Sequence, residues 1–430
     1  MKKRILLSGL ITLTVASMFL SCSTFSHASK QKTYVDMLAE RVPIKLTEEQ
    51  RVFVNDNNAF TLRFLNMVNE ADQSGRSFIY SPLSITYVLS MVNDAATGKA
   101  EQELEQTLGF HQGGIQAVNE YCKTLIENLP KADKKVEVNI ANAIFLNKNY
   151  TLKDQFKQDM QEYYAARAEA LDFSSSNTLG QINSWCRKKT NGMIPSILDK
   201  VEPVMVSYLL NAIYFKAEWN KKFSPENTKT ETFTTRNGSA QIPMMHQNVL
   251  IYYAKNDTYA AVEIPYGNKL WNMTVMLPEE GKTTDDIIRQ LAQAAKGDGT
   301  LTPLMSNVRA HKVDLKLPRF ETSSDTENME EGLVGLLEKM GIRQAFDSNC
   351  TEITNMCETP VFINMIRQKA KIIVNEKGTE AAAVTGSGML GGAAVDLTPR
   401  AVFHANRPFV YVIRESSSGV ILFVGKFTGE

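Results

Sequence analysis

The chain has 430 residues, enough for one large domain or for two or three of ordinary size. Hydrophobic residues make up 43% of it and charged residues 22%, with 24 glycines and 14 prolines, and this composition excludes a collagen-like, a disulfide-scaffold or a wholly disordered chain. The 47 basic residues equal the 47 acidic ones, so no charge excess argues for nucleic acid or for a large anionic partner.

The N-terminus has the pattern of a secretory signal. Three basic residues at 2–4 precede the apolar run 5–20, which is short for a membrane span, and the small residue Ser21 stands before Cys22. We therefore expect a signal peptide over 1–21 that is removed on export.

Cys22 is the candidate for lipidation. Its position directly after the expected cut resembles the lipobox of bacterial lipoproteins, in which the cysteine thiol is diacylated. The polar, lysine-rich segment 22–50 would then be a tether, and the protein an outer-membrane lipoprotein or an extracellular or periplasmic one. The alternative is an ordinary signal peptide that is cut further on, near Ala28.

From residue 51 onward, helix and strand patterns follow one another without an obvious linker. Apolar residues three or four apart predict helices, and alternating apolar residues predict strands. In chain order we expect a helix over 60–71, a helix over 101–108 closed by Gly109, strands over 136–140 and 313–317, a helix over 333–340 ended by Gly341, and a buried hairpin of 409–414 and 420–427. Helices come mostly early and strands mostly late, without regular β-α-β alternation, which favours an α+β fold.

The sequence contains no complete signature of catalysis or metal binding. Gly281-Lys282-Thr283 lacks the earlier glycine of a phosphate loop, and Gly386-Ser387-Gly388 lacks the first glycine of a nucleophile elbow. The five histidines are scattered and no C-x-x-C pair occurs. We therefore predict no enzyme, no cofactor and no metal site, and we expect buried, unreactive thiols at Cys122, Cys186, Cys350 and Cys357.

Two segments, FHANRPFVYVI at 403–413 and NEKGTEAAAVT at 375–385, carry a resemblance to a known family. The first is similar to the C-terminal signature of the serpin family of protease inhibitors, and the second to the hinge that begins the family's reactive-centre loop. Residues 80–85 and 211–219 are similar to two segments near the central sheet, and the likeness covers about 52–430. The resemblance implies a single serpin domain over 51–430, with a large central, mostly antiparallel sheet, flanking helices, further β-sheets and an exposed loop over about 377–402.

The resemblance also implies two groups of site residues. The hinge would comprise Glu376, Gly378, Thr379, Glu380, Ala381, Ala382 and Ala383. A polar network beneath and above the central sheet would comprise Ser81, Ser84, Asn211, Trp219 and Gln368, with Trp219 at the point of insertion. Gln368 stands where the family usually has histidine, but an amide can also donate and accept there. The alternative is that these side chains make ordinary capping and core contacts.

The loop itself supports an inhibitor that works by insertion. In such a serpin the cut loop becomes a new central strand, so every second residue must enter the core. The residues that would enter are uncharged, contain no proline and are nearly all small: Thr379, Ala381, Ala383, Thr385, Ser387 and Met389. Glu380 would face outward. The alternatives are a flexible linker, and a non-inhibitory serpin that acts as a binding or carrier module.

The expected reactive bond is Gly392–Ala393, sixteen residues beyond Glu376 by the family's usual spacing, with Ala394 and Val395 as alternatives. Small residues fit a shallow apolar specificity pocket, which indicates elastase-like or subtilisin-like serine proteases, with cysteine proteases as a further class. Arg400 abuts a strand expected to start near Ala401 and should be hard to present. The expected partner is thus a target protease, bound as a covalent acyl complex to a monomer that touches a membrane only through its lipid anchor and binds no nucleic acid.

Overall fold

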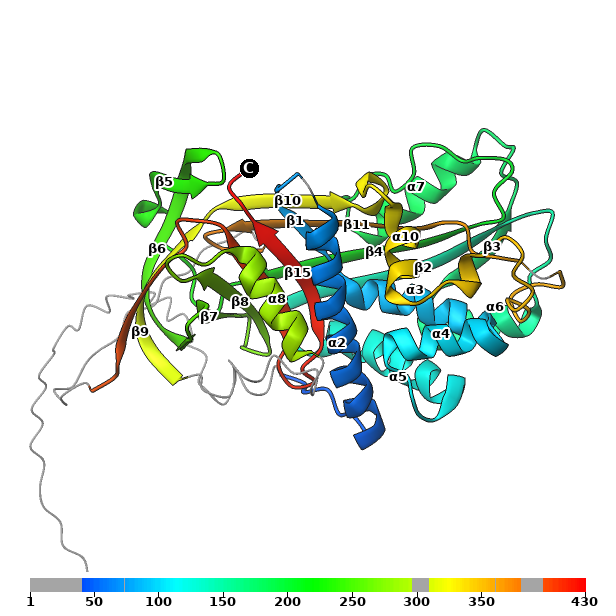
Figure 1. Ribbon diagram of the computed structural model, residues 1–430, viewed down its shortest axis with the longest axis horizontal. Coiled ribbons are helices and arrows are strands. Elements are labelled where there is room, and N and C mark those ends of the chain that lie inside the picture. Colours follow the sequence, from blue (N-terminus) through cyan, green and yellow to red (C-terminus); the bar gives the residue numbers. More distant parts are fainter. Residues whose placement is uncertain (1–40, 73, 296–308, 360, 380–396) are drawn as a thin grey trace, which may run out of the picture.

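The computed structural model describes residues 41–72, 74–295, 309–359, 361–379 and 397–430. The expected signal peptide with Cys22, the hinge residues Glu380, Ala381, Ala382 and Ala383, and the reactive-bond candidates Gly392, Ala393, Ala394 and Val395 lie outside these described residues. The helices are α2 (Glu48–Ala71), α3 (Pro82–Ala95), α4 (Gly98–Leu108), α5 (Gly114–Asn128), α6 (Asp154–Tyr164), α7 (Thr178–Lys189), α8 (Thr284–Ala294) and α10 (Gly332–Met340). This arrangement of helices with mixed sheets is the expected α+β fold (Figure 1).

A six-stranded central sheet has the order β10-β11-β12-β4-β2-β3. Its strands are β2 (Val136–Asn147), β3 (Arg167–Leu171), β4 (Ser207–Glu218), β10 (Phe320–Asp325), β11 (Ile366–Asn375) and β12 (Gly378–Thr379). Most neighbours are antiparallel, but β2 and β3 pair in parallel, and so do β11 and β4. The strand that the sequence predicted over 136–140 is part of β2 in this sheet.

A second, nine-stranded sheet follows the path β1-β15-β14-β8-β7-β6-β9-β13, with β5 beside β6. Its strands are β1 (Phe78–Tyr80), β5 (Lys229–Thr235), β6 (Gly238–Lys255), β7 (Tyr259–Tyr266), β8 (Trp271–Pro278), β9 (Arg309–Pro318), β13 (Arg400–His404), β14 (Phe409–Glu415) and β15 (Ile421–Phe427). β14 and β15 are the predicted C-terminal hairpin, and both are almost wholly buried.

Helix α3 lies beneath the central sheet, where it contacts β2, β4 and β11. All of its residues except Asp94 are buried, because apolar side chains occur all around the helix and not on a single stripe. Helix α7 covers the opposite face, where Ile182 and Trp185 pack with Phe145 of β2 (Figure 1). The central sheet is therefore covered on both faces.

The folded body begins earlier than the expected boundary at residue 51. Arg41 pairs with Asp133, Ile44 is buried, and Thr47 caps α2 through a capping box with Gln50. Residues 41–50 thus belong to the packed body, and the expected tether over 22–50 is too long at its C-terminal end.

Local signals predicted several element ends correctly. Gly109 adopts the left-handed conformation that closes α4, and α10 ends at Gly341. The predicted burial of the thiols is confirmed, because Cys122, Cys186, Cys350 and Cys357 are buried and free. Within the described ranges, no helix is both long and apolar enough to cross a membrane.

Candidate functional site: the hinge and the opening in the central sheet

The hinge already forms a short strand inside the central sheet. β11 runs to Asn375, and after a turn the chain returns as β12 between β11 and β4. Thr379 pairs with Val374 of β11 on one side and with Ala217 of β4 on the other. Residues 378–379 are thus the start of a strand that has an antiparallel neighbour on each side.

Beyond the end of β12, strands β11 and β4 stay unpaired with each other for a short stretch of the described chain before they pair. β11 and β4 pair with each other further along, where residues 366–369 lie beside 209–212 in parallel register. Between these points, no ladder pairing joins 370–373 of β11 to 213–216 of β4 in the part of the chain that the structure describes. The central sheet is therefore open in its middle, along the line in which β12 points.

Gly378 permits the chain to enter this opening. Its φ of 149° is one that side-chain-bearing residues rarely adopt, and a Cβ there would lie 2.0 Å from the carbonyl oxygen of Ala217. Only glycine allows the backbone of β12 to lie so close to β4.

Thr379 is the first hinge side chain inside the core. It is 1% exposed, and its hydroxyl shares a hydrogen bond of 2.8 Å with the phenol of Tyr266. Burial raises the pKa of Tyr266 well above its usual range, so this phenol stays protonated as a partner. The Tyr266 ring stacks on Trp219 at 4.3 Å between centroids, which links the hinge to the aromatic core.

Trp219 lies beside the turn between β11 and β12. Its backbone N–H donates to the carbonyl of Lys377 at 2.8 Å, and its indole N–H donates to the carbonyl of Asn375 at 2.9 Å. The predicted position of Trp219 near the insertion point therefore agrees with the contacts it makes.

Glu376 fixes the turn by its side chain. It is 6% exposed and accepts hydrogen bonds from Arg319 at 2.5 Å and from the Thr228 hydroxyl at 2.7 Å. Burial alone would raise the pKa of Glu376, but these donors outweigh it and hold the pKa below the usual value. The carboxylate thus stays ionised and paired at neutral pH.

Gln368 and Ser81 form the polar contact beneath the sheet. The Gln368 amide accepts from the backbone N–H of Ser81 at 2.9 Å and donates to the carbonyl of Ser81 at 2.8 Å. The Ser81 hydroxyl donates to Ser84, and Ser81 is the N-cap of α3. Gln368 thus donates and accepts here, as the sequence led us to expect of an amide in place of histidine.

Asn211 belongs to a separate chain of hydrogen bonds, although it is the direct Cα partner of Gln368 across β4 and β11. It donates to Asn142 at 2.7 Å, and Asn142 donates to the carbonyl of Tyr164. The Oδ1 atom of Asn211 is buried and has no hydrogen-bond partner among the described residues. The expected single network of Ser81, Asn211 and Gln368 is therefore divided into two.

Sequence reasoning missed the cluster around Arg367. Its guanidinium, 3% exposed, bonds Asp325 at 2.6 and 2.9 Å and Asp199 at 2.9 Å, and it pairs with Glu327. Tyr266, Arg319 and Thr228 at the hinge were missed as well. No motif marks these residues, because each acts through a partner that is distant in the sequence.

The far end of the loop is anchored by β13. Arg400 is the first residue of this strand and pairs with Lys312, so the strand begins one residue before the expected start. This supports the expectation that Arg400 is hard to present in an extended loop.

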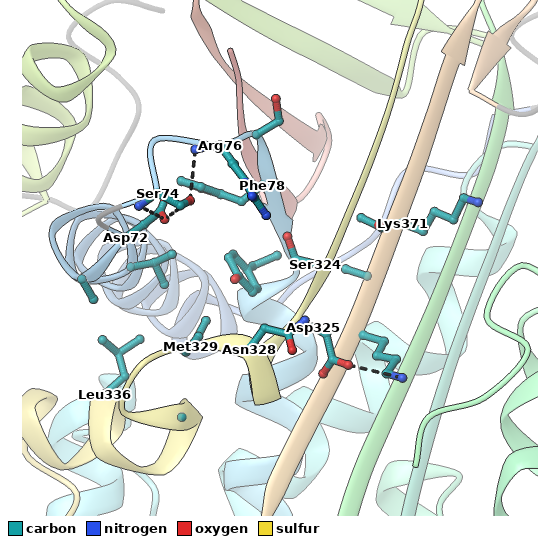
Figure 2. A pocket seen from close by; sticks show the side chains of 18 of the residues that line it. Asp72, Ser74, Arg76, Phe78, Ser324, Asp325, Asn328, Met329, Leu336 and Lys371 are labelled. Atoms are coloured by element: carbon teal, nitrogen blue, oxygen red, sulfur yellow. Dashed lines mark hydrogen bonds and ion pairs between the residues drawn. The ribbon is translucent and has the colours of Figure 1, made fainter. Parts of the chain in front are cut away.

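A cavity of about 720 Å³ lies beside the outer edge of the central sheet, between the end of α2, β1, β10, β11 and α10. Its lining combines apolar side chains such as Met329 and Leu336 with charged ones, among them Arg76 and Lys371 (Figure 2). Lys371 is paired with Glu321, and none of the predicted site residues lines the cavity. The cavity is thus distinct from the hinge.

Comparison with known proteins agrees with this architecture. The family model described as "Serpin (serine protease inhibitor)" matches residues 55–429. An uncharacterised serpin-like protein of Thermococcus kodakarensis is 28% identical over 93% of this chain and 89% of its own. The native structure of the thermophilic serpin tengpin has a TM-score of 0.78 at 25% identity, covering 90% of this chain and 96% of tengpin. Human thyroxine-binding globulin, solved with thyroxine, has a TM-score of 0.75 at 28% identity over 88% of this chain and 97% of its own.

A partly open central sheet that receives a hinge strand, covered by helices on both faces, defines the serpin class of fold. The chain belongs to the serpin family, whose members are in general inhibitors of proteases and not catalysts.

Proposed function

We propose that this protein is an inhibitory serpin that traps serine proteases by strand insertion. The observation that carries the proposal is β12, which already occupies the start of a strand between β11 and β4, with the open stretch 213–216 directly ahead of it. A loop that continued β12 as a longer strand would fill this opening.

The pairing of β12 predicts where each loop residue would go. Continued antiparallel pairing beyond Thr379 sets residues 380–383 beside 213–216. Two residues further on, Thr385 would come between Asn211 and Gln368, after these two strands have parted. Its hydroxyl would face the Oδ1 atom of Asn211, which has no hydrogen-bond partner among the described residues, and could donate to it.

The chemistry belongs to the target protease. Its nucleophile attacks the carbonyl of the reactive bond, an acyl bond to the loop forms, the C–N bond breaks, and the new amine takes the proton from the protease's general acid. Insertion of the severed loop adds ladder hydrogen bonds and buries small side chains. If this movement is faster than hydrolysis by water, the protease remains attached as an acyl complex.

The proposed targets are elastase-like or subtilisin-like serine proteases, with cysteine proteases as the second class. The support is the small side chains between Gly392 and Val395, together with the position of Arg400 inside β13. A protease with a buried acidic specificity pocket would find no cation among residues 392–395.

The second candidate function is a non-inhibitory binding or carrier serpin. The similarity to thyroxine-binding globulin favours it, because that serpin was solved in complex with the small molecule thyroxine. The two candidates differ in their response to proteolysis: a carrier would be cut without retaining the protease.

Incubation with a panel of purified proteases tests the proposal. We expect an SDS-stable complex with an elastase-like or subtilisin-like enzyme, and we expect Thr379→Arg to convert the protein into a substrate, since the buried site of Thr379 cannot hold an unpaired charge. Glu380→Arg is the matched control, because its side chain would face outward. Cleavage of the unaltered protein by every protease without any retained complex would favour the carrier function.

We also propose that the protein is exported and anchored through Cys22, and that it acts as a monomer. The support is the basic and apolar pattern that precedes this cysteine. Cells fed labelled palmitate should incorporate the label into the protein but not into a Cys22→Ala variant. A mature chain that begins near residue 29 would contradict lipidation and indicate the ordinary signal peptide.

A further inference from the structure

Exposed apolar side chains concentrate beside the C-terminal anchor of the loop. Seven large hydrophobic residues are exposed in the described part of the chain. Leu250, Tyr252 and Val402 lie on the neighbouring strands β6 and β13, and Leu397 lies three residues before β13. Most of the exposed large apolar side chains are therefore at one end of the molecule, where β6, β9 and β13 run together (Figure 1).

Strand pairing places three of them on a single sheet face. Leu250, Lys312 and Arg400 form one cross-strand row, and Asn248, Asp314 and Val402 form the next. Tyr252 lies two residues along β6 from Leu250 and so points to the same side. We call this surface the β6–β9–β13 face and define it by Leu250, Tyr252, Lys312, Asp314, Arg400 and Val402.

Packing of the strands against the core does not explain why these exposed side chains are apolar. The opposite side of the same strands carries the core residues Ile251, Val313 and Phe403, all buried. A strand with one buried face ordinarily alternates with polar residues on its solvent face. Leu250 and Val402, 61% and 65% exposed, depart from that pattern and mark a contact surface.

Side-chain contacts join the three strands of this face, which also carries basic residues. His246 of β6 and His404 of β13 both bond the carboxylate of Asp314, at 2.6 and 3.0 Å, and join the three strands through their side chains. Lys316 is paired with Glu231. Lys312 and Arg400 lie side by side in one cross-strand row of this face, and basic residues beside apolar ones suit a partner whose apolar patch is bordered by carboxylates.

We propose that the β6–β9–β13 face is a second contact surface for the body of the target protease, outside its active-site cleft. This inference rests on the proposed inhibitory function. Ten residues separate Gly392 from Val402, a reach of at most about 33 Å, whereas a protease domain of about 230 residues is on the order of 45 Å across. A protease bound at the reactive bond is thus close enough to contact this face. The face is also continuous along the chain with the loop that the protease binds.

The surface contributes to the encounter and not to the insertion. Contacts made before cleavage raise the association rate, and the later competition between insertion and hydrolysis depends on the hinge and the sheet. Changes on the face should therefore slow complex formation and leave the yield of complex per inhibitor molecule unchanged.

The test measures the second-order association rate constant and the stoichiometry of inhibition with the protease that the panel identifies. We expect Leu250→Ser combined with Val402→Thr to lower the rate constant at least about fivefold at unchanged stoichiometry. Val204→Thr is the matched control, because Val204 is 89% exposed but lies in the segment that leads into β4, outside the face. Lys312→Glu, which leaves the apolar side chains in place, should lower the rate constant most at low salt.

Unchanged rate constants in both variants would overturn the proposal, as would an equal loss in Val204→Thr. Self-association of the unaltered protein that the double substitution abolishes, with unchanged inhibition rates, would assign the face to a second copy of the chain and also overturn it. Failure of the inhibitory function itself gives a different result, since the unaltered protein would then form no SDS-stable complex at all. Melting curves of the variants exclude misfolding as a cause of slow association.

Discussion

The side-chain amide of Gln368 bonds both backbone polar groups of Ser81, and these two residues are 287 positions apart in the chain. Gln368 lies in β11, and Ser81 is the N-cap of the buried helix α3. Both residues are fully enclosed, so water cannot replace either bond. The pair therefore ties β11 to the helix beneath it, at the place where the proposed inserting strand would pass.

Replacing Gln368 by alanine should destabilise the protein by about 1–3 kcal/mol, because the buried N–H of Ser81 loses the amide oxygen that it bonds, whereas the Ser81 carbonyl still accepts from the N–H groups of Ser84 and Ile85. Chemical denaturation measures this loss. The control is Gln241→Ala, since Gln241 is exposed and makes a single side-chain bond to Thr232; we expect a change within about 0.5 kcal/mol there. Equal stability of the two variants would contradict the role assigned to Gln368.

Gly378→Ala should displace β12 from the sheet. The added Cβ would meet the Ala217 carbonyl oxygen at 2.0 Å, and the positive φ of the residue adds backbone strain. We expect a loss of at least about 2 kcal/mol in denaturation and a change in the fluorescence of Trp219, which packs beside the hinge. Gly180→Ala in α7 has open space around it and should be neutral or slightly stabilising. An unaltered Gly378→Ala protein would show that β12 is not held between β4 and β11.

The Glu376 contact should make hinge stability depend on pH. Because the folded-state pKa of Glu376 is lowered, its contribution is fully present above the unfolded value of 4.5 and is lost as the pH falls through the folded-state pKa. At about pH 7 we expect Glu376→Gln to be less stable by about 1–2 kcal/mol, and this difference should shrink as the solution is acidified below about pH 4.5.

Denaturation of both proteins across this pH range measures the effect. Glu321→Gln is a suitable control, because the Glu321 pair with Lys371 is more than half exposed on the carboxylate side and should contribute little at any pH. A stability difference for Glu376→Gln that stays constant down to strongly acidic pH would show that the ionised carboxylate is not what holds the turn.

Thr385→Val should weaken insertion without affecting the intact protein. In the inserted strand this side chain would come between Asn211 and Gln368, where the Asn211 Oδ1 atom has no described partner. Loss of the hydroxyl should lower the stability of the cleaved form by about 1 kcal/mol and raise the stoichiometry of inhibition. The reverse isosteric exchange, Val384→Thr, would face outward and should change neither quantity. If both exchanges have the same effect, the predicted pairing is wrong.

Cleavage in the loop should raise the melting temperature by at least about 10 °C, because completion of the strand adds roughly ten ladder hydrogen bonds of about 1 kcal/mol each. Mass spectrometry of the released C-terminal peptide should place the cut between Leu390 and Val395. Thr379→Arg, cut in the same way, should show no such rise. A peptide that begins at Ala401, or an unchanged melting temperature, would contradict the assignment.

Much of the scaffold could be predicted from local sequence. The ends of α4 and α10 follow from glycines that take a conformation other residues avoid, and the C-terminal hairpin follows from two buried apolar runs around a polar turn. The hinge could be located because residues 375–385 resemble a family motif. These features can be predicted from the sequence because each depends on residues only a few positions apart.

The partners of the site residues could not be predicted in this way. Thr379 meets Tyr266 across 113 positions, Glu376 meets Arg319 across 57, and Gln368 meets Ser81 across 287. The division of the polar network, with Asn211 bonded to Asn142 and not to Gln368, follows from the pairing of β4 with both β2 and β11.

The sequence by itself determined the α+β class, several element ends, and the small, uncharged alternate residues that the proposed insertion of the loop requires. Only the tertiary structure decided that β12 is already paired at one end of an opening, that the pairing of 366–369 with 209–212 closes the other end, and which apolar side chains of β6 and β13 share one exposed face. The physical reason is that strand register and buried hydrogen bonds join distant segments. Their partners are selected by how the whole core packs, and no local pattern in the chain encodes that choice.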